Sequence, residues 1–169
     1  MKRRITTTAL RERFEKAWSA VPAPEQKSLR PFIRYVDEVP VLKGTFVYGR
    51  PRGGTAIESM AGPLERGVGH TAFLSLASGN VVDVILSADP LASCDEDAAL
   101  AVILHELAHA WDYLRETISE RSVDGMERYA RALAQDWASK ASLPDELKDN
   151  VKQRAGSYIL KATGLWTNC

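Results

Sequence analysis

The stretch of sequence that decides the fold is residues 95–116, which read DEDAALAVILHELAHAWDYLRE. On a helical wheel of about 100° per residue, the apolar side chains fall on one side, and His105 and His109 fall on the other. We therefore expect an amphipathic helix that buries its apolar stripe. The stripe consists of Leu100, Ile103, Leu104, Leu107, Ala108, Trp111 and Leu114.

The segment His105-Glu106-Leu107-Ala108-His109 carries the residue types and the spacing of a metal site. Imidazoles four residues apart stand one above the other on a helix, so both can reach a zinc ion about 2.0–2.1 Å away. Glu106 is rotated by about a quarter turn, where it can accept a proton from an activated water without being a ligand. The pattern predicts one Zn²⁺ ion held by His105 and His109, with Glu106 as the catalytic base. The alternative is a solvated or capped histidine pair without metal.

Strand-like segments precede this helix, and helical segments surround it. We expect strands at residues 33–38 and 44–49, a loop at 50–68, and a hairpin of residues 70–76 and 81–87. Helices are expected at residues 7–20, 125–140 and 145–163, and Pro22-Ala23-Pro24 is expected to end the first of them. Strands first and helices second predict an α+β fold, in which a small twisted sheet packs on the active-site helix and C-terminal helices follow. We expect one domain over residues 1–169, with the metal core at 70–140 and an unassigned role for 1–65.

Composition narrows the class of protein. The 169 residues contain 22 Lys+Arg and 22 Asp+Glu, a zero net charge that argues against a nucleic-acid binder. No apolar run approaches the roughly 20 residues of a membrane span, and the basic start lacks the apolar core of a secretory signal. The two cysteines, Cys94 and Cys169, are too few for a disulfide framework. They could pair with each other, but the default expectation is two free thiols. The cytoplasm is therefore the default location, and the sequence does not predict an oligomeric state.

Residues 102–112, VILHELAHAWD, resemble the active-site helix of zincin metallopeptidases. The spacing His-Glu-x-x-His-x-x-Asp is also similar to that of lethal-factor-type metallopeptidases. The resemblance implies a zincin-like fold and a zinc metallopeptidase that hydrolyses a peptide or protein substrate. It further implies that the strand at residues 81–87 borders the cleft and pairs with extended substrate.

The third zinc ligand is open among the carboxylates Asp112, Glu116, Glu120 and Glu127. Asp112 lies about 7.5 Å along the helix from a metal held between the two histidines, which favours a supporting role for its short side chain. Gluzincins, the zincins with a glutamate ligand, place it on the following helix, and this resemblance favours Glu127, eighteen residues after His109. Arg128 and Arg131 do not match the pattern that gluzincins have around this ligand. Because Asp124 and Glu127 also have capping-box spacing, the alternative is that Glu127 only caps the N-terminus of this helix. Glu120 is the next candidate.

The resemblance also implies a donor that stabilises the oxyanion of the attacked carbonyl. His70, Tyr113, Tyr129 and Tyr158 are the candidates, and the sequence does not choose among them. The C-terminal Cys169 could fold back and silence the site. Two alternative functions stay open: a toxin or effector protease with one dedicated protein target, and a non-catalytic binding module.

Overall fold

The computed structural model describes residues 7–36, 69–76, 79–87, 91–92, 94–115 and 123–157. The first helix, α1 (Thr7–Trp18), is followed by a second helix, α2 (Ala23–Leu29), which our sequence analysis did not expect. Pro22 and Pro24 were read only as the end of α1. They instead occupy the N-cap and the first turn of α2, where a missing N–H costs nothing. A short 3₁₀ turn, η1 (Arg30–Phe32), leads into strand β1 (Ile33–Val36).

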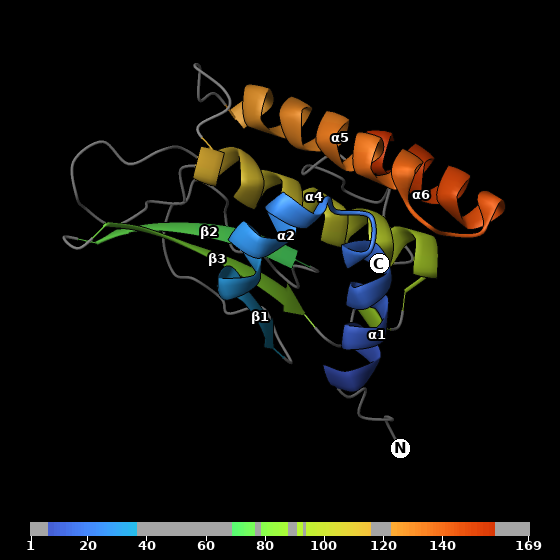
Figure 1. Cartoon of the computed structure of the whole chain (residues 1–169), viewed down its shortest axis with the longest axis horizontal. Helices are drawn as coiled ribbons and strands as arrows, with labels where there is room; N and C mark the ends of the chain where they lie inside the picture. The colour runs from blue at the N-terminus through green and yellow to red at the C-terminus, as the bar shows by residue number, and fades with distance from the viewer. Residues whose placement is uncertain are drawn as a thin grey trace.

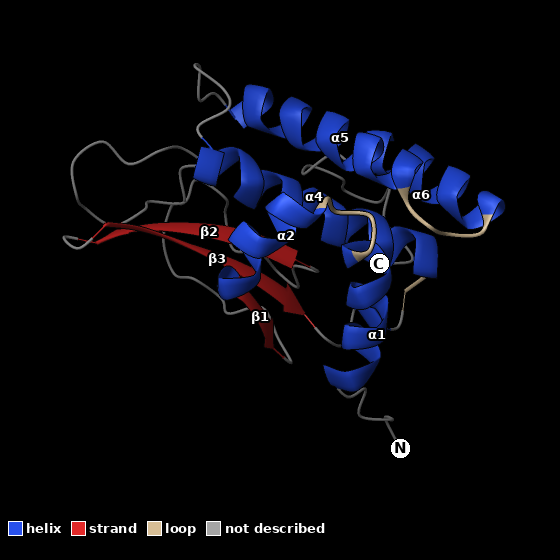
Figure 2. Cartoon of the chain, in the orientation of Figure 1, coloured by secondary structure: helices blue, strands red, loops and turns tan. Residues whose placement is uncertain are grey.

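Three strands form a small sheet with the order β1-β3-β2, shown in red in Figure 2. Strands β2 (Gly69–Leu76) and β3 (Gly79–Ser87) pair antiparallel, and β1 pairs parallel with residues 84–87 of β3. Over residues 84–86, both edges of β3 are therefore already paired. This overturns the expectation that residues 81–87 as a whole are free to pair with substrate. The strand expected at 44–49 and the loop at 50–68 lie outside the described residues.

Three helices form the C-terminal half: α4 (Glu96–Arg115), α5 (Val123–Lys140) and α6 (Asp145–Ser157). Figure 1 shows α5 and α6 on one side of α4 and the sheet on the other, and α4 also contacts α1 and α2. Arg154 Nε donates a 2.7 Å hydrogen bond to Asp97 Oδ2, which ties α6 to the first turn of α4. The helix at the centre of the molecule is thus the one that carries both histidines.

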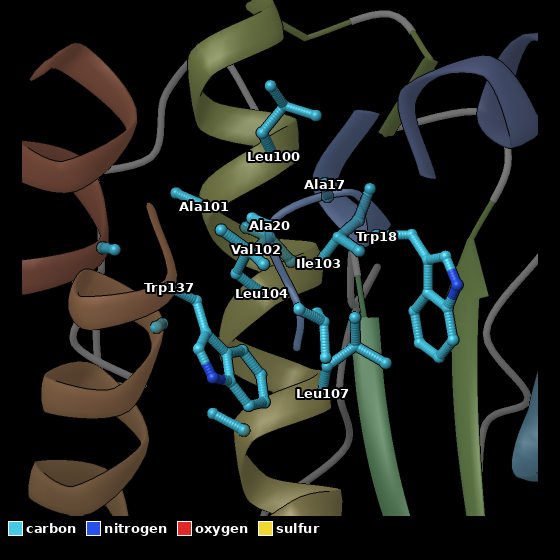
Figure 3. Close-up of a cluster of buried hydrophobic side chains, with 14 of the residues drawn as sticks. Ala17, Trp18, Ala20, Leu100, Ala101, Val102, Ile103, Leu104, Leu107 and Trp137 are labelled. Carbon is cyan, nitrogen blue, oxygen red and sulfur yellow. The ribbon is translucent and has the colours of Figure 1, made fainter. Parts of the chain in front are cut away.

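Helix α4 is buried on every side rather than along one stripe, because every residue from 98 to 112 is buried. Figure 3 shows the apolar side chains of α4 between Trp18 of α1 and Trp137 of α5. Leu100, Ile103 and Leu107 are fully buried, as the wheel predicts. The face of His105 and His109 is also buried, which the wheel does not predict.

The predicted fold class, α+β with a zincin-like sheet as an organising layer, is wrong. The described core is helical, because α1, α2, α4, α5 and α6 supply nearly all of its buried side chains. The prediction failed because the order of strand-like and helical segments does not reveal which elements pack around the central helix. Helix α5 packs on the histidine face of α4, where Glu127 meets both imidazoles, a face that we expected to look into a cleft.

Cys94 is not a free thiol, contrary to our expectation: it is disulfide-bonded. The only other cysteine of the chain, Cys169, lies outside the described residues. Disulfides persist mainly in oxidising compartments, so the cysteine content no longer supports a cytoplasmic location. Among the described residues, no helix has the length and apolar character that a membrane crossing requires.

Candidate metal centre

The centre of the candidate site is a triangle of three side chains from two helices. His105 Nε2 lies 3.0 Å from His109 Nε2 and 3.1 Å from Glu127 Oε2. His109 Nε2 lies 3.1 Å from Glu127 Oε1. Helix α4 brings the imidazoles together because its geometry stacks positions four apart, and the packing of α5 against α4 brings the carboxylate to them.

Protons leave one contact of this triangle without a hydrogen bond. Each histidine Nε2 faces its own oxygen of Glu127, so two N–H groups can both donate to the carboxylate. The two Nε2 atoms then remain 3.0 Å apart with no hydrogen shared between them, because an imidazole N–H points in one direction only. One cation between the three side chains would satisfy all of them at once.

The dimensions of the triangle suit a small tetrahedral ion. Ligand bonds of about 2.0–2.1 Å at tetrahedral angles place ligand atoms about 3.3–3.4 Å apart, a few tenths of an ångström more than the edges here. Two imidazole nitrogens and one carboxylate oxygen are the donors that zinc takes in catalytic sites, where a fourth position stays open. In the described part of the chain, these three residues form the single group of ligand-type side chains close enough to hold a metal.

The three side chains are almost inaccessible to solvent. The exposed fraction is 0% for His105, 3% for His109 and 7% for Glu127. Burial lowers the pKa of His105 to about 4, and the charge of His109 adds to this, so the ring is neutral at pH 7, as a metal ligand must be. Burial alone would raise the pKa of Glu127, but its hydrogen bonds to both histidines hold that pKa well below the usual range. The carboxylate is therefore ionised and ready to bind a cation.

His109 behaves differently from its neighbour. Burial opposes its protonation, but the hydrogen bond and the charge of Glu127 outweigh burial and raise its pKa. The charges of Glu106 and Asp112 act in the same direction. Both carboxyl groups are buried, with exposed fractions of 3% and 1%. The structure thus surrounds the triangle with negative charge, which favours a bound cation.

The structure brings together only some of the residues that the sequence put forward. Glu127 meets the histidines with both carboxylate oxygens. It lies in the second turn of α5, which begins at Val123, so it is not at a capping position of that helix. Asp112 is buried beside the site without belonging to the triangle.

The remaining candidates fall at the margin of the site or beyond the described part of the chain. Tyr129 is half-buried on α5, and no hydrogen bond joins it to the described residues of the site. His70 lies on β2, where its backbone pairs with Ile85. Glu116, Glu120, Tyr158 and the Cys169 tail lie outside the described residues, and nothing is described of the side chain of Tyr113.

Sequence reasoning missed one residue, Arg131. Its Nε donates a 3.2 Å hydrogen bond to the backbone oxygen of Glu127, and the side chain is half-buried. The signal was present, because Arg131 follows Glu127 by four residues and therefore shares its face of α5. We set it aside as a departure from the gluzincin pattern.

Comparison with models of protein families, with curated proteins and with solved structures finds no match to this chain. The functional argument therefore depends on the site's own geometry and on the chemistry of its residues.

Proposed function

We propose that this protein is a zinc-dependent hydrolase that cleaves peptide bonds in a peptide or protein substrate. The observation that carries the proposal is the triangle of His105, His109 and Glu127, with ligand atoms 3.0–3.1 Å apart in a buried setting. The motif's resemblance to the active-site helix of metallopeptidases supports the same reading. Three protein ligands leave one coordination position open, as catalytic rather than structural zinc sites do.

Zinc bound by these residues would polarise a carbonyl group and lower the pKa of a bound water toward about 7. Glu106 is the proton acceptor, because it follows a ligand directly in sequence and its charge acts on His109. The side chain of Glu106 is only 3% exposed, so bulk water hardly competes with a bound water for its carboxylate. After taking a proton from the attacking water, Glu106 can pass it to the leaving amine, which restores the carboxylate.

The donor set alone does not select zinc, because two histidines and one carboxylate also hold ferrous iron in oxygenases. Glu106 favours a hydrolase over an oxygenase, because a buried carboxylate next to the metal ligands can transfer the proton that hydrolysis requires. Metal analysis of the purified protein tests this directly. Zinc near one ion per chain supports the proposal, and stoichiometric iron without zinc contradicts it.

The decisive variant is Glu106→Gln, which keeps the shape of the side chain and removes its ability to accept a proton. We expect it to retain metal and to lose about 10²–10⁴-fold in hydrolysis of a peptide library. Glu12→Gln, an exposed position on α1, is the matched control and should retain full activity. Hydrolysis by Glu106→Gln at the wild-type rate would refute the mechanism. A wild-type protein that binds zinc but cleaves nothing in the library or in a whole-proteome digest would instead indicate a binding module.

A further inference from the structure

One cation next to the triangle has no role in holding a metal. Arg131 lies one turn after Glu127 on α5, and its Nε is fixed on the backbone oxygen of Glu127 at 3.2 Å. A positive charge so close to a ligand repels a divalent ion and weakens its binding. A residue that opposes metal binding in a buried site calls for another explanation.

The side chain of Arg131 lies against the ligand Glu127 and is more accessible to solvent than the ligands. It is half-buried, whereas His105, His109 and Glu127 are nearly inaccessible. Among the described residues, no hydrogen bond engages its Nη1 or Nη2 groups. These two groups form the planar fork that binds a carboxylate with two parallel hydrogen bonds.

We propose that Arg131 is the specificity-determining residue of this site and that it binds a carboxylate of the substrate next to the metal. The inference rests on the proposed function and narrows it to peptides with an acidic group close to the scissile bond. That group is a C-terminal carboxylate or the side chain of Asp or Glu. Both present the same two oxygens to the guanidinium, and the experiment separates them.

The competing explanation is that Arg131 only balances charge. The carboxyl groups of Glu106, Asp112 and Glu127 carry one more negative charge than a divalent cation neutralises, and Arg131 would complete the balance. Both explanations predict a stable, charged Arg131. Only the binding role predicts that Arg131 discriminates between an acidic ligand and its neutral amide.

The experiment measures binding by the spectrum of the cobalt-substituted protein, without any need for turnover. The probes are three short peptide hydroxamates of equal length: one with a free C-terminal carboxylate, one with a C-terminal amide, and one with the amide and a glutamate side chain. The hydroxamate anchors each probe on the metal. The ratio of dissociation constants therefore reports the contribution of the carboxylate alone.

We expect one of the two acidic probes to bind the wild-type protein roughly ten- to a hundredfold more tightly than the neutral amide. The acidic probe that does so identifies the source of the carboxylate. Arg131→Gln should reduce the ratio to about one, and Arg131→Lys should keep part of it. Arg128→Gln is the matched control, because it removes the same charge from an exposed neighbouring position on α5.

A ratio near one in the wild-type protein would overturn the inference, even if Arg131→Gln failed to fold. An acidic preference that persists in folded Arg131→Gln would overturn it as well and would leave charge balance as the explanation. In both cases the hydroxamates still perturb the cobalt spectrum, so the metal site stands. A protein that takes up no cobalt would overturn the proposed function, and this inference with it.

Discussion

His105 Nε2 and Glu127 Oε2 lie 3.1 Å apart and join the middle of α4 to the second turn of α5. Both side chains are buried, and Glu127 is ionised because its hydrogen bonds to the two histidines lower its pKa. An ionised carboxylate in a dry site is costly unless positive charge neutralises it. Without metal, the proton that His109 holds supplies part of that charge, and a bound divalent ion would supply more. We therefore expect metal to strengthen the contact between the two helices.

The first prediction concerns the ligands themselves. His105→Ala and Glu127→Gln should each weaken zinc binding by more than about 100-fold, because even partners that only orient ligands cost about 10–100-fold when removed. Metal content after dialysis, and the affinity for zinc in competition with a chelator, measure the effect. Glu146→Gln, an exposed position on α6, is the control and should bind zinc as the wild type does.

The same measurement separates Glu127 from Asp112 as the third ligand. Asp112 is buried but does not belong to the triangle, so Asp112→Asn should retain a stoichiometric ion with an affinity lowered by at most about 100-fold. Loss of the ion in Asp112→Asn, together with its retention in Glu127→Gln, would exchange the roles of the two residues. That outcome would also contradict a metal site formed by His105, His109 and Glu127.

The second prediction is that zinc binding releases a proton from His109. In the absence of metal, hydrogen bonding to Glu127 raises the pKa of His109 against the effect of burial, and only the neutral ring can bind the ion. Zinc affinity should therefore rise with pH up to the raised pKa of His109 and level off above it. His105 adds no dependence above about pH 5, because its pKa is about 4.

Calorimetry in buffers of different ionisation enthalpy counts the released protons. Close to one proton per ion is expected near pH 6, and fewer as the pH rises. A heat of binding that is independent of the buffer at pH 6 would contradict a protonated His109.

The sequence was sufficient to predict the helix and its motif, because an apolar stripe and a histidine pair are local features of residues 95–116. It was not sufficient to predict that this helix is buried on all sides. That burial arises in part because α5 packs on the histidine face, and the exposure of a face depends on segments distant in sequence. The same limit explains the wrong fold class, since local patterns do not reveal which elements share the core.

Two further differences have local causes. Helix α2 was missed because Pro22 and Pro24 were read as breakers, although proline is favourable in a first helical turn. Arg131 was set aside because it did not match a family pattern, although its spacing from Glu127 already placed it on the same face. For Arg131, the helical spacing of side chains was more informative than the resemblance to gluzincins.

The third prediction concerns the core of α4. Leu107 is fully buried between the two histidine positions in sequence, so Leu107→Ala should lower the free energy of unfolding by about 2–5 kcal/mol. Chemical denaturation followed by circular dichroism measures this. Arg128→Ala, at an exposed position on α5, should change the free energy by less than about 0.5 kcal/mol. A loss below about 1 kcal/mol in Leu107→Ala would show that α4 is not the centre of the core.

The last prediction concerns the attachment of α1 to the segment that precedes α4. Arg13 Nη1 donates hydrogen bonds to the backbone oxygens of Leu91, at 2.8 Å, and Cys94, at 2.6 Å. Both acceptor residues are buried, so removing the donor takes one hydrogen bond from each of two buried carbonyl groups. Arg13→Met keeps much of the apolar stem and should cost about 1–3 kcal/mol of unfolding free energy. Arg128→Met, which removes the same charge from an exposed position, should be close to neutral. Equal stabilities of the two variants would mean that the bonds of Arg13 contribute nothing to holding α1 against the start of α4.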